Sequence, residues 1–201
     1  MDKVLIFLRH GQAESNAGGY YGGQHDVPLT ALGRQEAADT APMLAGVQFD
    51  KVYCSDLSRA MDTAALAIPG CNPEIRPEIR EVALGEVTLK TTAECTALWG
   101  EHFTQNRAKG NFEPFGGESL EMLDKRIGDF LDEIIAKEDE KIIGIVSHGG
   151  AISSAARHLV GRLPLSALDN CGVCIFVQSG DKWVVKKWNA TAKVKWAAAH
   201  A

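Results

Sequence analysis

The sequence lacks both a long apolar run and an excess of basic residues. None of its apolar stretches approaches the roughly 20 residues that a membrane-spanning helix needs. Its formal net charge is -5, whereas a general nucleic-acid binder needs a basic face that replaces phosphate counterions. We therefore expect neither a membrane nor a nucleic-acid partner, and any anion site must be a local positive pocket in an acidic protein.

The chain also lacks the cysteine spacing of a disulfide framework. Its five cysteines are an odd number, and Cys171-x-x-Cys174 has no second pair, which favours core packing over a redox or zinc site. The apolar run Val4 to Leu8 near the N-terminus is too short for the core of a signal peptide. A reducing cytoplasm is the location that these features predict.

What the sequence does contain is typical of one globular α/β domain. With 201 residues, of which 45% are hydrophobic, residues 1–201 are predicted to form a single domain. Short apolar runs alternate with helical periodicity, which indicates layers of helices on a sheet. The predicted strands are residues 4–8, 51–54 and 142–146, with a hairpin of 173–177 and 183–185. The predicted helices follow Thr30, Ser55, Ser119 and Gly150.

Three stretches are harder to interpret. Pro42 lies within the apolar stripe of the helix that follows Thr30, and we expect it to kink or shorten that helix. Residues 75–82 are predicted as an ambiguous extended stretch broken by Pro77. Residues 88–117 show the least regular pattern in the chain, with aromatic residues scattered through them.

Two of the predicted strands end in a histidine followed by glycine, at Arg9–Gly11 and at Ser147–Gly150. In open α/β sheets, ligands bind at the carboxyl ends of the strands. The planar fork of an arginine suits phosphate oxygens, and a neutral imidazole nitrogen can act as a nucleophile. Arg59, at the start of a predicted helix, adds a second guanidinium. Gly11 is expected to permit the turn and a close approach of the backbone to a ligand.

The alternatives to an anion site have less support. A single histidine at a strand end usually has a structural role, and metal binding would call for a His-Glu-x-x-His pattern or an acidic cluster, which the sequence lacks. Walker, Gly-x-Gly-x-x-Gly and Gly-x-Ser-x-Gly motifs are absent as well. The residues alone therefore lead to an anion site.

At this point the sequence resembles a known family, the histidine phosphatase superfamily, also called the phosphoglycerate mutase-like family. The run Leu8–Asn16 looks like the family signature. Further similar blocks follow in the family's order: Gly22-Gly23, Asp26, Pro28–Thr30, Tyr53–Ala60, Gly116–Ser119 and Ser147–Gly150. The resemblance implies a three-layer α/β sandwich with a mostly parallel central sheet flanked by helices, and a cap over the active site formed by residues 88–117.

The resemblance also implies roles for individual residues. His10 would be phosphorylated, while Arg9, Arg59, His148 and Asn16 hold the phosphate oxygens; the substrate-binding residues would be Asn16, Gly22, Gly23 and Gly149. Glu81 would be the general acid and later the base. Because Gly85–Lys90 departs from the family's usual aromatic-Glu-Gly group, Glu86 remains a second candidate for the acid. Two arginines and a histidine supply the positive charge, so no metal and no cofactor is expected.

Three functions follow from the resemblance. The first is hydrolysis of a phosphomonoester, a small phosphorylated metabolite, through phosphohistidine, in the phosphatase branch and similar to α-ribazole phosphatases. The second is phosphoryl transfer as in a phosphoglycerate mutase, which requires priming by a bisphosphate. The third is a non-catalytic module that binds phosphorylated ligands. A homodimer is compatible with all three.

Overall fold

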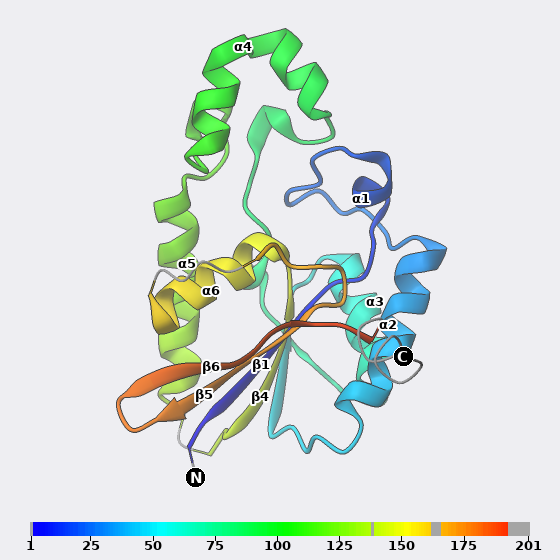
Figure 1. The fold of residues 1–201 in the computed structure, drawn as a ribbon, viewed down its shortest axis with the longest axis vertical. Coiled ribbons are helices and arrows are strands. Elements are labelled where there is room, and N and C mark those ends of the chain that lie inside the picture. Colours follow the sequence, from blue (N-terminus) through cyan, green and yellow to red (C-terminus); the bar gives the residue numbers. More distant parts are fainter. Residues whose placement is uncertain (1, 138, 162–165, 193–201) are drawn as a thin grey trace.

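A six-stranded mixed sheet forms the centre of the computed structural model, which describes residues 2–137, 139–161 and 166–192 (Figure 1). The strands are β1 Val4–Arg9, β2 Lys51–Cys54, β3 Glu74–Ile75, β4 Ile142–Ser147, β5 Val173–Ser179 and β6 Lys182–Ala190. Their order is β3-β2-β4-β1-β5-β6. The pairs β3–β2, β2–β4 and β4–β1 are parallel, and β5 and β6 are added antiparallel.

Helices cover both faces of this sheet. The α-helices are α1 Glu14–Gly18, α2 Ala31–Leu44, α3 Ser58–Ala67, α4 Thr92–Ala108, α5 Leu120–Ile135 and α6 Gly149–Val160; short 3-10 turns are η1 Pro77–Ile79, η2 Gly85–Val87 and η3 Glu113–Phe115. One core lies under α5 and α6 and includes Leu5 and Phe7. The other lies under α2 and α3 and includes Ile6 and Leu8. Since successive residues of β1 face opposite cores, the strand is apolar throughout, and the predicted three-layer sandwich is confirmed.

The prediction of an irregular segment at residues 88–117 was wrong, because α4 occupies most of it. The helix begins with a capping box: the Thr91 side chain accepts from the Glu94 backbone N–H, and the Glu94 carboxylate accepts from that of Thr91. Inside α4, Gly100 has φ 55° and ψ -132°, which breaks the helix into two parts. Cys95 in the first part and Phe103 in the second are the buried residues of α4, too few to mark an apolar stripe in the sequence.

The other two uncertain stretches also become clear. Pro42 lies in the last turn of α2, which ends two residues later at Leu44. The extended interpretation of residues 75–82 was wrong over η1, where Pro77 occupies the first position of a 3-10 turn. Proline suits that position because its ring fixes a helical φ and the position needs no N–H donor.

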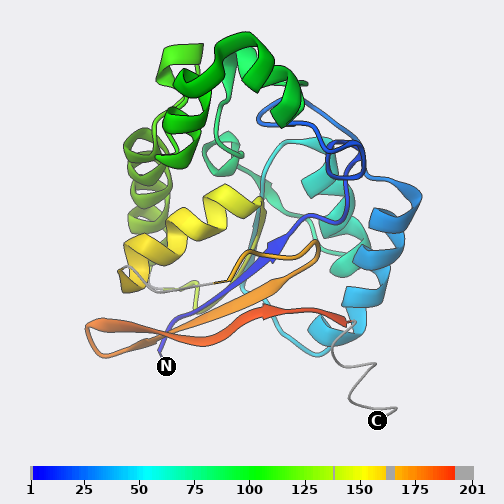
Figure 2. The ribbon, with the colours of Figure 1, turned by 45° about the horizontal axis from the view of Figure 1, so that its top comes forward.

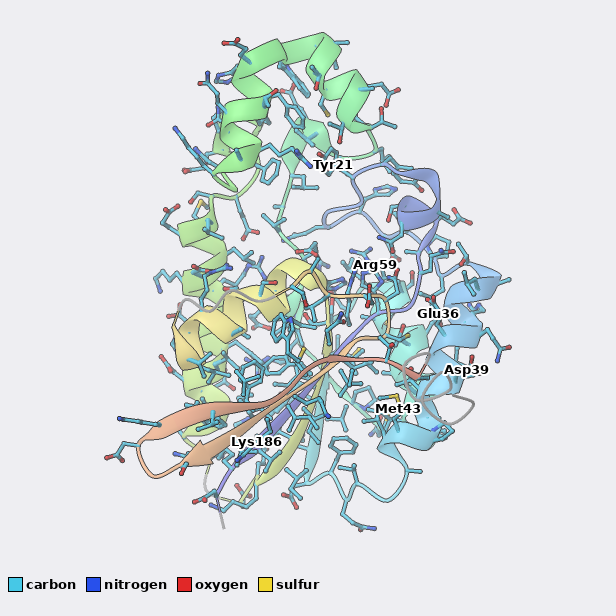
Figure 3. All side chains as sticks on the ribbon, in the orientation of Figure 1. Tyr21, Glu36, Asp39, Met43, Arg59 and Lys186 are labelled. Atoms are coloured by element: carbon cyan, nitrogen blue, oxygen red, sulfur yellow. The ribbon has the colours of Figure 1, made fainter. Side chains whose placement is uncertain are left out.

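A small third core joins α4 to the rest of the molecule, beyond the end of the sheet (Figures 1 and 2). It consists of Leu84, Val87, Cys95, Phe103, Phe112 and Phe115. Tyr21 lies between α4 and the loop that contains α1 (Figure 3), with its ring 6.1 Å from that of Phe103 and its hydroxyl 3.0 Å from Thr92 Oγ1. In the described part of the chain, no helix is long and apolar enough to span a membrane.

Candidate active site

The sheet brings the two histidines together. Strands β1 and β4 are parallel neighbours in which Arg9 is opposite Ser147, so the residues that follow, His10 and His148, emerge at the same sheet edge. Their ring centroids are 5.1 Å apart. Arg59 reaches the same place from the first turn of α3, directly after β2, which pairs with the other side of β4.

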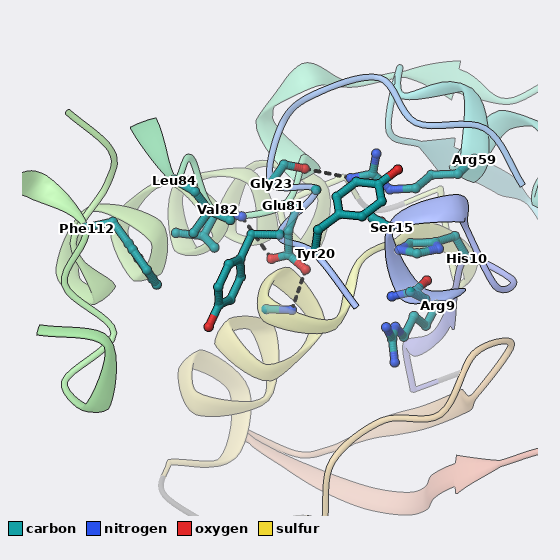
Figure 4. A pocket seen from close by; sticks show the side chains of 14 residues that line it. Arg9, His10, Ser15, Tyr20, Gly23, Arg59, Glu81, Val82, Leu84 and Phe112 are labelled. Carbon is teal, nitrogen blue, oxygen red and sulfur yellow. Dashed lines mark hydrogen bonds between the residues drawn. The ribbon is translucent and has the colours of Figure 1, made fainter. Parts of the chain in front are cut away.

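A cavity of about 320 Å³ opens at this edge. It is lined by Arg9, His10, Ser15, Asn16, Tyr20, Tyr21, Gly22, Gly23, Arg59, Glu81, Val82, Leu84, Phe112 and Gly150. Arg9, His10 and Arg59 form what we term the basic end, and Val82, Leu84 and Phe112 form the apolar end, with the Glu81 carboxylate between them (Figure 4). The cavity can therefore hold an anionic group at one end and an uncharged group at the other.

His10 has the protonation state of a nucleophile. Its side chain is buried, and Nδ1 lies 2.7 Å from the carbonyl oxygen of Gly11. Since a carbonyl can only accept, Nδ1 carries the proton and Nε2 keeps its lone pair. Burial, followed by the charges of Arg59 and Arg9, lowers the pKa of His10 to about 3, so the imidazole is neutral at physiological pH.

His148 is fully buried, with a relative exposure of 0%, and its ring is oriented by a residue that we had not singled out. Its Nε2 lies 2.9 Å from Ser55 Oγ, which also accepts a longer bond from the backbone N–H of Leu57. Burial and the neighbouring His10 hold the pKa of His148 well below 6.5. When Ser55 donates to Nε2, the proton of the neutral ring is on Nδ1, which can then donate to an anion. The position of Ser55 directly after β2 was the available signal.

Backbone carbonyls accept hydrogen bonds from both guanidinium groups. Arg59 donates to the carbonyls of His25 at 2.9 Å and Gly23 at 2.7 Å, and Arg9 Nη1 donates to the carbonyl of Leu168. Arg9 Nε and His148 Nδ1 are buried without a hydrogen-bond partner among the described residues. Buried donors of this kind are rare in folded proteins, and an anion at the basic end would accept from both.

Glu81 lies at the centre of the cavity and Glu86 does not line it. The two carboxylate oxygens of Glu81 accept from the backbone N–H groups of Val82 at 2.9 Å and Gly150 at 3.1 Å (Figure 4). A Cβ on Gly150 would lie 2.2 Å from the Glu81 carboxylate, so a larger residue here would push that carboxylate out of its place. Glu86 is exposed on η2.

The structure brings three of the four proposed substrate-binding residues to the cavity. Asn16, Gly22 and Gly23 line it, whereas Gly149 does not and its neighbour Gly150 does. The side-chain oxygen of Asn16 accepts from the backbone of Ala13 and from Asn170, which leaves its amide group as the donor toward a ligand. The apolar end carried no recognisable sequence signal, since Leu84 and Phe112 belong to different loops.

Gly11 is needed where two backbone segments pack closely. A Cβ there would lie 2.3 Å from the carbonyl oxygen of Gly33, so Gly11 allows the loop after β1 to pack against the first turn of α2. Within the described residues, no three His, Cys, Asp or Glu side chains gather in a way that could hold a metal ion.

Comparison with known proteins identifies the family. The model of the histidine phosphatase superfamily (branch 1) matches residues 5–191. A glucosyl-3-phosphoglycerate phosphatase from Mycolicibacterium vanbaalenii is 32% identical over 94% of this chain and 96% of its own. An adenosylcobalamin/alpha-ribazole phosphatase from Salmonella typhimurium is 31% identical over 82% of each chain. A mycobacterial glucosyl-3-phosphoglycerate phosphatase, solved in complex with VO3, superposes with a TM-score of 0.83 at 30% identity, covering 94% of this chain and 100% of that one. The chain belongs to the histidine phosphatase superfamily, branch 1.

Proposed function

We propose that this protein hydrolyses phosphomonoesters through a phosphohistidine formed on His10. The observation that carries the proposal is the neutral, buried His10 imidazole, whose Nδ1–H is held by the Gly11 carbonyl while two guanidinium groups flank the ring. This arrangement presents an unprotonated Nε2 to a group that the arginines attract. The chain's relatives among the phosphatases support the same reaction.

In the first step, His10 Nε2 attacks phosphorus as the bond to the ester oxygen breaks. Arg9, Arg59 and the Nδ1–H of His148 donate to the three equatorial oxygens, over which the transition-state charge is spread. Protonated Glu81, which lies between the two ends of the cavity, gives its proton to the departing ester oxygen. The products of this step are a free alcohol, phospho-His10 and a Glu81 carboxylate.

In the second step, water takes the place of the alcohol. The Glu81 carboxylate removes a proton from it, the resulting oxygen attacks phosphorus, and the P–N bond to His10 breaks. The electron pair of that bond returns to Nε2, so the step releases phosphate and restores neutral His10. Glu81 regains the proton that it lost in the first step, and the cycle is balanced.

The charge of the cavity favours hydrolysis over phosphoglycerate mutase chemistry. Among the described residues that line the cavity, Arg9 and Arg59 are the two basic side chains, and both lie at the basic end. A bound phosphoglycerate would place its carboxylate beyond Glu81, toward Leu84 and Phe112, where no described cation lines the wall. Burying an unpaired carboxylate is costly, so an uncharged leaving group is the better fit.

The size of the cavity supports a small phosphorylated metabolite as the substrate. A volume of about 320 Å³ is at the lower end of the range for small-molecule sites, about 300–1,000 Å³. We further propose that the protein works in the cytoplasm. We also propose that it has no nucleic-acid partner, because its net charge is -5.

The function is tested with p-nitrophenyl phosphate and 3-phosphoglycerate, using the wild-type protein and His10→Ala. We expect phosphate release by the wild type and none by His10→Ala, because the imidazole forms the bond to phosphorus. Rapid quenching should trap an acid-labile, base-stable phosphoenzyme that mass spectrometry locates on His10.

The other outcomes identify the alternatives. Isomerised phosphoglycerate with no release of phosphate would indicate a mutase. No turnover of any ester in a wide panel of phosphate esters would indicate a binding module. Phosphate found on a serine or cysteine, or an active His10→Ala protein, would overturn the mechanism.

A further inference from the structure

The general acid of the proposed mechanism lies on a segment without regular structure. Glu81 is in the stretch between η1, which ends at Ile79, and η2, which begins at Gly85. Its backbone therefore lacks the repeating hydrogen bonds that hold His10 and His148 at strand ends. A general acid must stay within hydrogen-bond reach of the leaving oxygen, so other contacts must fix this segment.

Arg126 provides the first set of contacts. It lies on α5, and its guanidinium donates to three backbone carbonyls of the segment: to Glu78 at 2.6 Å, to Arg80 at 3.1 Å and to Glu81 at 3.3 Å. One side chain therefore ties the segment on the N-terminal side of the Glu81 carboxylate to a helix of the main core.

Glu118 provides the second set and is itself bound to Arg126. Its two carboxylate oxygens accept from Arg126 Nε at 2.9 Å and Nη2 at 2.7 Å, and one of them also accepts from the backbone N–H of Ala83 at 2.8 Å. The backbone N–H of Glu118 donates to the carbonyl of Ala83 at 2.8 Å. A Cβ on Gly117 would lie 2.3 Å from that carbonyl, so glycine is needed for the close approach.

The pair thus brackets Glu81, with Arg126 bound on one side of it and Glu118 on the other. Neither residue lines the cavity, and both side chains are mostly buried, with relative exposures of 20% and 14%. Their side chains therefore do not face a ligand at the basic end. The position of Glu118 gives a role to the Gly116–Ser119 block of the sequence, which contains no catalytic residue.

We propose that the Arg126–Glu118 pair positions Glu81 for proton transfer to the leaving group; this rests on the proposed function. Disrupting the pair should move the Glu81 carboxylate while His10, Arg9 and Arg59 keep their places on β1 and α3. The step that suffers is protonation of the departing oxygen, and a shift of about 1 Å can lower a rate by roughly 100-fold.

The test uses two substrates of nearly the same shape that differ in their need for a proton. Phenolate, whose conjugate acid has a pKa of about 10, leaves poorly without protonation, whereas p-nitrophenolate leaves readily. For Arg126→Gln and Glu118→Gln we expect kcat/KM for phenyl phosphate to fall about 10- to 100-fold and kcat/KM for p-nitrophenyl phosphate to fall less than about threefold. The ratio kcat/KM is compared because it reports transfer to His10 and leaves out the later hydrolysis, in which Glu81 acts as the base for both substrates.

A matched control separates positioning from general loss of structure. Arg157 on α6 binds Asp124 of α5 in a more exposed ion pair between a helix and its neighbour, and neither residue lines the cavity. Arg157→Gln should lower the unfolding midpoint without changing the ratio of the kcat/KM values for the two substrates. If Arg126→Gln does not fold, Glu118→Gln, which keeps the size of the side chain, gives the answer.

A double-mutant cycle completes the experiment. Because the pair acts through Glu81, adding Arg126→Gln to Glu81→Gln should lower kcat/KM for phenyl phosphate less than about twofold beyond the effect of Glu81→Gln alone. Equal losses of kcat/KM on both substrates, or losses of kcat/KM that multiply in the double variant, would overturn the positioning role while wild-type phosphatase activity stands. A wild type without phosphatase activity would instead remove the proposed function itself.

Discussion

The two ends of the cavity are built in different ways. At the basic end, Arg9 and His10 follow directly from β1, and His148 from β4, in the middle of the sheet. At the apolar end, Leu84 and Phe112 come from loops and pack in the small core that includes α4. The groups proposed to react are thus fixed by the main cores, whereas the surface that would contact the leaving group belongs to a separate, smaller one.

This difference suggests a division of labour. Rigid strand ends hold charges where phosphate oxygens would lie, and any phosphomonoester would present the same oxygens. The apolar end faces the part of the substrate that varies. Changes at the basic end should therefore affect all substrates equally, and changes at the apolar end should affect them selectively.

The largest effect is expected for Arg59→Lys. Two arms of the Arg59 fork are held by the carbonyls of Gly23 and His25, and a lysine ammonium cannot keep these contacts and bind the anion as well. We expect kcat to fall about 100- to 1,000-fold, equally for phenyl and p-nitrophenyl phosphate. Arg34→Lys, at an exposed ion pair with Asp62, serves as the control. A loss that depends on the leaving group would contradict the division between the ends.

A smaller effect concerns stability against pH and again arises at the basic end. The pKa of His10 is lowered to about 3 by burial and two guanidinium groups, whereas it is about 6.5 in the unfolded chain. Between these values the unfolded chain binds more protons, so stability is lost as pH falls below 6.5. From pH 7 to 5, His10 should remove about 2 kcal/mol of the free energy of unfolding.

Urea denaturation of the wild type and His10→Asn measures this contribution. The free energies of the two proteins should change in parallel between pH 8 and 7 and diverge between pH 7 and 5, where the wild type loses more. Parallel curves down to pH 5 would mean that His10 titrates near its ordinary pKa and that the basic end is less positive than its geometry implies.

The same division explains what could be predicted from the sequence. His10 and His148 were found because each lies beside a glycine directly after an apolar strand, and Arg9 because it precedes His10 at the end of β1. At these positions chain position alone determines which sheet edge a residue reaches. The sequence analysis predicted a mostly parallel sheet, which restricts the possible strand orders, and the structure adds that β1 pairs with β4 across more than 130 residues of chain.

The apolar end could not be predicted in this way. Phe112 and Leu84 meet only because η2 and η3 pack closely, where Gly85 and Gly117 leave room for backbone contacts, and no local pattern encodes such a contact. The position of Ser55 directly after β2 places it at the sheet edge, but its hydrogen bond with His148 depends on two side-chain rotamers that the sequence does not encode locally. Helix α4 buries two residues, Cys95 and Phe103, and therefore shows no apolar stripe that would have predicted it.

The smallest expected effect tests the apolar end itself. Phe112 and Phe115 lie in the same small core and are similarly buried, but only Phe112 is among the described residues lining the cavity. Phe112→Leu should raise KM for naphthyl phosphate about three- to tenfold, the value of a lost aromatic contact, and leave KM for acetyl phosphate nearly unchanged. Phe115→Leu should lower the unfolding midpoint to a similar degree without this selectivity. Equal KM changes for the two variants would show that the small core as a whole, rather than the wall of the cavity, determines substrate binding.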